Sequence, residues 1–320
     1  RIVVGAIGND AAGTNAGHAR VFERSGNTWV QLGEDIDGEA ADDRFGGAVA
    51  ISDDGSRVAI GSYLNDGGGN SSGHVRVFDY IDGVWTQVGT DIDGPAGAGL
   101  GSSVAMSASG HRVIAGGPGV GSANGIARVY ELVSNVWTQI GAFALGGELG
   151  HAVAMSDDGN RVAISHPSAS GGVLPGTTRV YDYNGTTWDL VGNLIEGEAA
   201  GDNAGHALSM NGAGDIIAIG APYNIGEGTD GGGVRGGHVR VYRLENGTWT
   251  QLGQDMDGPP GAGFGTSVAI SGDGTRLVAG APYPSIVRLY LFDSTEWQLS
   301  ETPQFIDARR NGNSVAISAD

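Results

Sequence analysis

Three aspartate pairs, each in the pattern Asp-x-Asp-Gly, are the groups in this sequence best suited to hold a metal ion. Closely spaced carboxylate oxygens are the ligands that a hard cation such as calcium prefers. An alternative needs no metal, because an Asp side chain can cap a tight turn while the Gly supplies a positive φ. The turn is the favoured interpretation, and the speculative metal ligands are Asp35, Asp37, Asp91, Asp93, Asp255 and Asp257.

The seven histidines are the other residues that could serve as metal ligands or acid–base groups. His18, His74 and His238 each precede one kind of apolar run, while His151 and His206 lie in another. Either chemistry requires two or three such side chains to converge, and these lie in different repeats. We therefore expect structural roles for the histidines, and we predict no catalytic residue.

The composition excludes several classes of function. The chain has 320 residues, no Cys, and only Arg among its 17 basic residues, which excludes thiol nucleophiles, disulfides and Schiff-base lysines. Its 36 acidic residues give a net charge of -19, which opposes nucleic-acid binding because that affinity rests on cations. No apolar run approaches the roughly 20 residues of a membrane helix, so direct membrane insertion is not expected.

An internal repeat governs the whole chain. Six tryptophans occur, and an Arg inside a short apolar run such as HVRVF lies nine residues before each of them. Identical placement in every copy favours architecture, in which the Arg pairs with a carboxylate and the Trp packs between repeats. Repeated sugar stacking is the alternative for the tryptophans. These structural residues are Arg20, Arg76, Arg128, Arg179, Arg240, Arg288, Trp29, Trp85, Trp137, Trp188, Trp249 and Trp297.

A second repeated block, AVAISDDGSRVAIG in one copy, adds two more short apolar runs around a tight turn. Runs rich in Val, Ile and aromatic residues and bounded by Gly, Asn or Asp are typical of strands. Four antiparallel strands, a to d, make one blade, so we predict an all-β, closed six-bladed β-propeller of one domain. Pairing near Val3 and Val315 is expected to close the ring. The predicted blades are 1–33 with 313–320, 46–89, 101–141, 150–192, 205–253 and 265–300.

The connection from strand b to strand c is the part of the repeat that varies most. From the Gly or Ser that closes strand b to the Arg of strand c, the offset ranges from 8 to 20 residues, whereas the a-to-b turn keeps its length. Variable loops on a fixed scaffold usually carry binding. The predicted ligand-binding residues are Asn9, Asp10, Tyr63, Asn65, Asp66, Tyr223, Asn224, Glu227, Asp230, Arg235 and Tyr283.

The block FGTSVAISGDGTRLVAGAP, residues 264–282, resembles the FG-GAP repeat of integrin α-subunit propellers. The stretch DIDGEAADDRFGGAVAISDDGSRVAIGS is similar to the tandem FG-GAP-like arrays of marine microbes and algae. Integrin propellers have seven blades, against six predicted here, and hold calcium in several a-to-b turns. Turns such as SDDGSR and SASGHR carry too few spaced carboxylates for that ion. Calcium is therefore not expected in these turns, and no other cofactor is predicted.

These features predict an extracellular or cell-surface module, not an enzyme, that binds or adheres to a protein or a glycan. Two alternatives stay open. The chain could be a structural unit of a larger extracellular scaffold or filament, with neighbouring copies or further domains of a longer chain as partners. It could also be a propeller hydrolase, although the a strands that would face the channel are almost wholly Ser, Val, Ala, Ile and Met.

Overall fold

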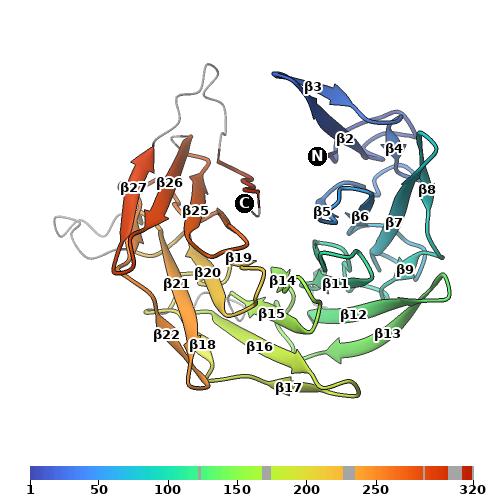
Figure 1. Ribbon diagram of the computed structural model, residues 1–320. Helices are drawn as coiled ribbons and strands as arrows, with labels where there is room; N and C mark the ends of the chain where they lie inside the picture. The colour runs from blue at the N-terminus through green and yellow to red at the C-terminus, as the bar shows by residue number, and fades with distance from the viewer. Residues whose placement is uncertain (122–123, 168–173, 226–234, 284, 302–311, 319–320) are drawn as a thin grey trace. The chain divides into compact units, whose positions relative to one another are not determined.

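Every regular element in the described part of the chain is a β-strand. The computed structural model describes residues 1–121, 124–167, 174–225, 235–283, 285–301 and 312–318. The strands form six antiparallel sheets of four or five strands each (Figure 1). The predicted fold class, an all-β propeller with six blades, is confirmed. None of the described residues belongs to a helix that could cross a membrane.

The chain divides into two compact units. Unit 1 is Arg1–Gly159 with Gly185–Thr187, and unit 2 is Asn160–Asn184 with Trp188–Asp320. The single domain expected from the sequence stays a prediction.

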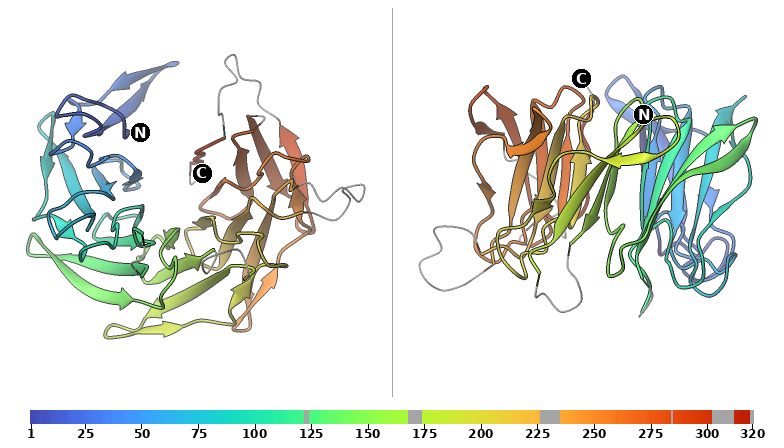
Figure 2. Two further views of the ribbon diagram at one scale, coloured as in Figure 1. Left: turned by 180° about the vertical axis from the view of Figure 1, so that it is seen from behind. Right: turned by 90° about the horizontal axis from the view of Figure 1, so that it is seen from below.

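Unit 1 stacks its sheets in chain order, β1-β2-β3, β5-β6-β7-β8 and β10-β11-β12-β13, as two further views show (Figure 2). Its strands are β1 (Ile2–Ala6), β2 (His18–Ser25), β3 (Thr28–Gln31), β4 (Ile36–Asp37), β5 (Ala48–Ile51), β6 (Arg57–Ser62), β7 (His74–Ile81), β8 (Val84–Gln87), β9 (Ile92–Asp93), β10 (Ser103–Met106), β11 (Arg112–Gly117), β12 (Ile126–Val133), β13 (Val136–Phe143) and β14 (Val153–Met155).

Unit 2 repeats the arrangement with β15-β16-β17, β19-β20-β21-β22 and β24-β25-β26-β27. Its strands are β15 (Arg161–His166), β16 (Thr177–Tyr183), β17 (Trp188–Leu190), β18 (Ile195–Glu196), β19 (Ala207–Met210), β20 (Ile216–Ala221), β21 (His238–Glu245), β22 (Thr248–Gln251), β23 (Met256–Asp257), β24 (Ser267–Ile270), β25 (Arg276–Ala281), β26 (Ile286–Phe292) and β27 (Trp297–Glu301).

A short fifth strand is the element that the prediction of four strands per blade missed. β4, β9, β18 and β23 each pair with a c strand, namely β2, β7, β16 and β21. Two residues are too few to show a strand pattern, so the sequence could not reveal them. In three of these strands the second residue is the second Asp of Asp-x-Asp-Gly. The aspartates are thereby fixed beside the first residue of strand c.

The predicted closure of the ring is not among the described strand pairs. β1 pairs with β2 along its whole length, Ile2–Ala6. Residues 315–318 lie outside any strand. Pairing near Val3 and Val315 joins segments of different units and stays a prediction.

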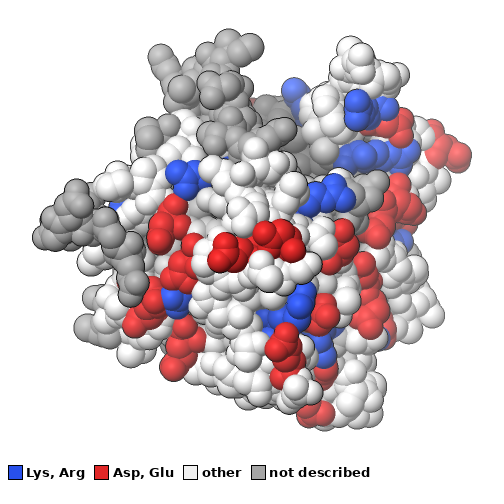
Figure 3. Space-filling view, turned by 60° about the vertical axis from the view of Figure 1, so that its left-hand side comes forward, with Lys and Arg blue, Asp and Glu red and all other residues white. Residues whose placement is uncertain are grey.

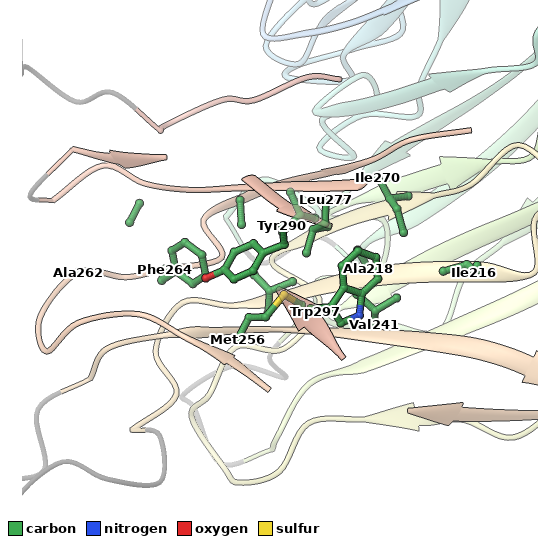
Figure 4. Close-up of a cluster of buried hydrophobic side chains, with 14 residues drawn as sticks. Ile216, Ala218, Val241, Met256, Ala262, Phe264, Ile270, Leu277, Tyr290 and Trp297 are labelled. Atoms are coloured by element: carbon green, nitrogen blue, oxygen red, sulfur yellow. The ribbon is translucent and has the colours of Figure 1, made fainter. Parts of the chain in front are cut away.

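Most b strands are largely buried, although β1 of the first blade is exposed or half-buried at every residue. All of β20 is buried, and β6 is buried at every residue after Arg57. Strands covered on both faces read as unbroken apolar runs, which explains sequences such as RVAIGS. In unit 2 the b and c strands join a core in which Phe264 meets Tyr290 at 6.4 Å between ring centroids (Figure 4).

Tryptophan side chains link successive blades. The indole N–H groups of Trp85, Trp137, Trp249 and Trp297 each donate, at 2.8–3.0 Å, to the carbonyl of the residue that follows strand d of the preceding blade. Since these indoles are engaged inside the fold, packing rather than sugar stacking accounts for them. Trp29 differs, with 50% of its surface exposed.

Candidate functional site

Two kinds of polar feature lie where the b-to-c loops lead into the c strands. One is a hollow in unit 2, lined by loops that follow strand b. The other is a set of clusters in which a buried His meets carboxylates. Figure 3 shows carboxylates gathered in groups on one face, with arginines beside them.

The hollow has a volume of about 490 Å³ and is bordered by the loops after β20 and β25 and by the loop before β24. Tyr223 and Tyr283 stand at its edge, with 48% and 57% of their surfaces exposed. The guanidinium of Arg235 lies 5.3 Å from the centre of the Tyr223 ring, a cation–π contact that orients both groups. His206 also lines the hollow, and burial lowers its pKa, so that its imidazole is neutral at pH 7.

Three of the eleven predicted ligand-binding residues therefore meet at one hollow, namely Tyr223, Arg235 and Tyr283. Glu227 and Asp230 lie outside the described residues. Tyr63 accepts a hydrogen bond from Arg44 at 3.3 Å.

The remaining predicted ligand-binding residues shape their own loops. Asn9 and Asp10 accept backbone N–H groups from Ala11 and Asn15 at 2.9 and 2.8 Å. Asp66 does the same for Ser71 at 2.7 Å.

The two other asparagines of this set are buried. Asn65 donates to Asp43 at 2.9 Å, and Asn224 donates to Asp202 at 2.9 Å. Both side chains are therefore engaged inside the protein rather than available to a ligand.

The carboxylate clusters arise from strand register. His18 pairs with Asp37 across β2 and β4, and the same register brings His74 beside Asp93 and His238 beside Asp257. A carboxylate from the preceding blade joins two of the clusters. We call these the His74 cluster, formed by Glu39, His74, Asp91 and Asp93, and the His238 cluster, formed by Glu198, His238, Asp255 and Asp257.

In the His238 cluster an arginine occupies the centre. Arg240 donates to both oxygens of Asp255, at 2.9 and 2.7 Å, and also pairs with Glu198. Although burial works against ionisation, the hydrogen bond from Arg240 lowers the pKa of Asp255 below its ordinary value. Arg20 forks onto Asp35 in the same way, at 2.9 and 2.7 Å, and lowers the pKa of Asp35.

In the His74 cluster the arginine lies elsewhere. Arg76 donates to Gln87 at 3.0 Å, and its guanidinium lies over the rings of Phe45 and Phe78 at 5.3 and 5.0 Å. Burial raises the pKa of Glu39, and Asp91 adds to that shift despite the opposing charge of Arg76.

Two further titratable groups of the His74 cluster also respond to burial. Burial raises the pKa of Asp93, helped by the charge of Asp91. Burial lowers the pKa of His74 to about 4, so its imidazole is neutral at pH 7. This cluster thus gathers negative charge that no arginine among the described residues neutralises by a direct hydrogen bond.

The expected role of glycine in Asp-x-Asp-Gly was wrong. Gly38, Gly94 and Gly258 do not occur among the described residues with positive φ. A Cβ on Gly38 would lie 2.3 Å from the carbonyl oxygen of Ala16, and one on Gly94 would lie 2.2 Å from that of Ser72. The glycine is required by a close backbone approach. The carboxylates of Asp35 and Asp255 accept from Arg and Gln side chains rather than capping a turn.

The sequence held a signal for these clusters. The histidines were expected not to converge with one another, but His18, His74 and His238 each lie beside aspartates. Seventeen residues separate the His from the first Asp in all three copies, as in His74 and Asp91. Glu39 follows the Gly of Asp-x-Asp-Gly, and Glu198 follows Gly197 at the corresponding place in a repeat that lacks this motif; neither was predicted. A search for a constant spacing between His and Asp, rather than among the histidines alone, would have found the clusters.

The a-to-b turns use their carboxylates internally. Asp54 accepts from the hydroxyl groups of Ser52 and Ser56 at 2.7 and 2.8 Å, and from the backbone N–H of Ser56 at 2.9 Å. Asp273 makes the equivalent contacts with Ser271 and Thr275. Hydrogen bonds within the turn therefore explain why Asp, Ser and Thr occur at these positions.

Comparisons with known proteins agree with this fold. The family model of the FG-GAP repeat matches residues 36–78, which run from β4 through most of β7. A solved structure, the hydrazine synthase of Kuenenia stuttgartiensis, is similar with a TM-score of 0.62 and 13% sequence identity, covering 95% of this chain and 84% of that one. At this identity the likeness concerns the fold alone. None of the curated proteins matches the sequence.

Proposed function

Because the chain is a β-propeller carrying the FG-GAP repeat, we propose that it is a binding module that recognises a glycan or a protein through the hollow beside Tyr223 and Tyr283. The observation that carries this proposal is the exposure of two aromatic rings at the edge of a hollow of about 490 Å³. Ligand sites of proteins usually measure about 300–1,000 Å³. A role in adhesion at the cell surface or outside the cell is part of the proposal, and it rests on the resemblance to integrin-type repeats.

The chemistry of the hollow suits a polar ligand with a flat face. Tyr rings offer apolar faces for stacking and hydroxyl groups for hydrogen bonds. Arg235 adds fixed donors, and Thr266 adds a hydroxyl group. A sugar ring presents both kinds of surface, as does the side chain of a bound protein loop.

The same features favour binding over hydrolysis. None of the described residues that line the hollow is a carboxylate. The a strands β5, β10, β19 and β24 also carry none, whereas a glycosidase requires a pair of them. The carboxylates gather instead at the His clusters, where Arg side chains engage several of them.

A glycan array tests the proposal, with purified protein compared with Tyr223→Ala and Tyr283→Ala. We expect the wild-type protein to bind a defined set of glycans, and each substitution to reduce the signal at least tenfold. Trp29→Ala is the matched control, because Trp29 is an equally exposed aromatic residue outside the hollow. Glycan binding that survives both Tyr substitutions, or that depends on Trp29, would contradict the proposed site.

A further inference from the structure

His74 is a buried side chain whose polar atoms lack partners. Its surface is 1% exposed, and neither ring nitrogen makes a hydrogen bond with a described residue. A buried polar group without a partner costs free energy, about 1–3 kcal/mol for an ordinary neutral group. Such a group requires an explanation, and a bound ion is one explanation.

Carboxylates surround the unpartnered imidazole. Nδ1 of His74 lies 3.8 Å from an oxygen of Asp91 and 4.0 Å from an oxygen of Asp93. Glu39 reaches the same place from the preceding blade, and one ligand atom each from Glu39, His74 and Asp91 lie within 4.8 Å of one another. Two ligands of a tetrahedral zinc ion lie about 3.4 Å apart, given bonds of about 2.0–2.1 Å. Small side-chain movements would bring the three atoms to that spacing.

Few donors compete for these oxygens. Among the hydrogen bonds of the described residues, the carboxylate of Asp91 accepts one, from Gln87 at 2.6 Å. Arg76 lies 3.7 Å from Glu39 and 3.9 Å from Asp91 without donating to either. Its single positive charge is outnumbered by three carboxylates. Glu39 and Asp91 are partly exposed, so an ion in solvent can reach their carboxylates.

We propose that Glu39, His74 and Asp91 bind a divalent transition-metal ion, with zinc as the representative ion, and that this ion links the first blade to the second. The imidazole nitrogen determines the class of ion. Calcium and magnesium take oxygen ligands, whereas zinc and its neighbours in the first transition row accept a mixed set of imidazole and carboxylate. The site goes beyond the proposed binding function and does not depend on it.

The His238 cluster provides a comparison within the same chain. It has the same residue types, but Arg240 donates to Asp255 and pairs with Glu198, so a cation already occupies the centre. The structure therefore assigns one metal ion to the His74 cluster and none to the His238 cluster.

Calorimetric titration with zinc chloride tests the proposal on the full chain, prepared without a polyhistidine tag and dialysed against a chelator. We expect the wild-type protein to bind zinc, and Glu39→Gln, Asp91→Asn and His74→Gln each to weaken binding at least tenfold. Glu198→Gln is the matched control and should leave the affinity unchanged. Circular dichroism verifies that each variant folds. If His74→Gln does not fold, Glu39→Gln and Asp91→Asn still test the site, because they change partly exposed residues.

Thermal unfolding provides a second readout of zinc binding at the His74 cluster. Zinc should raise the midpoint of thermal unfolding for the wild-type protein and for Glu198→Gln, but not for Glu39→Gln. The proposal is overturned if the wild-type protein binds no zinc, or if zinc binding persists in both Glu39→Gln and Asp91→Asn. Equal weakening by Glu198→Gln, or displacement of zinc by millimolar calcium, would overturn it as well.

Discussion

The His74 and His238 clusters share one sequence pattern, His-x-Arg followed by Asp-x-Asp-Gly, but their arginines make different contacts. Arg240 forks onto Asp255, whereas Arg76 lies over Phe45 and Phe78. Tyr242 and Phe78 occupy the same position in the two repeats, and the ring of Phe45 adds a second face near Arg76. The difference teaches that a repeated motif fixes where charges lie, while neighbouring side chains decide whether those charges are neutralised within the protein.

The largest expected effect concerns the two arginines. Arg240→Met leaves Asp255 and Glu198 without their cation, and we expect a loss of about 2 kcal/mol in the free energy of unfolding, less than for a fully buried pair because the carboxylates are partly exposed. Arg76→Met should cost about 1 kcal/mol or less, because Arg76 has only longer-range contacts with its carboxylates. Urea unfolding of the metal-free proteins measures both values. Equal losses would show that the two clusters do not differ as described.

Removing the charge of the glutamate in each cluster should have a smaller effect on stability, and this effect should have opposite signs in the two clusters. Burial raises the pKa of Glu39, so its charged form costs stability, and that cost grows as the pH rises from the unfolded-state pKa of about 4.5 and is complete above the folded-state pKa. Glu39→Gln should therefore stabilise the metal-free protein at pH 7, by about 0.5 kcal/mol or less, a value discounted because water screens this exposed carboxylate. Glu198→Gln should destabilise it by about 1 kcal/mol, because Glu198 pairs with Arg240 and accepts from Asn224. Thermal unfolding in chelator measures the two changes, and the same sign for both would contradict this account.

The smallest expected effect concerns Asp273, a carboxylate of an a-to-b turn rather than of a cluster. Hydrogen bonds from Ser271 and Thr275 lower the pKa of Asp273 to about 2. Its contribution to stability is therefore complete above the unfolded-state pKa of about 3.8 and is lost as the pH falls toward 2. Asp273→Asn should flatten the acid limb of the stability profile by about 0.5 kcal/mol, a value discounted because the carboxylate is exposed. An unchanged acid limb in the variant would remove Asp273 from this role.

The sequence predicted the architecture because the residue patterns that form the strands recur in every blade. Short Val- and Ile-rich runs indicated the strands, and the constant Arg–Trp spacing identified residues that link blades, such as Trp297, which donates to Leu252 at 2.9 Å. The two-residue strand β9 escaped prediction because so short a segment has no periodicity.

The site was harder to predict because its parts come from different blades. Tyr223, Tyr283 and Arg235 could be chosen as loop residues of suitable chemistry, and the structure places them at one hollow. Glu39 lies 35 residues from His74 in sequence, and only strand register and packing bring the two together. The guanidinium of Arg76 lies over the ring of Phe45, which precedes β5 and is 31 residues away in sequence, so no local pattern around Arg76 indicates this contact.

Anomalous X-ray diffraction at the zinc absorption edge, from crystals grown with zinc, tests the central difference between the two clusters most directly. The account predicts a strong peak between Glu39, His74 and Asp91, and no peak between Glu198, His238 and Asp255. A crystal without a peak at the His74 cluster, or with equal peaks at both clusters, would contradict it.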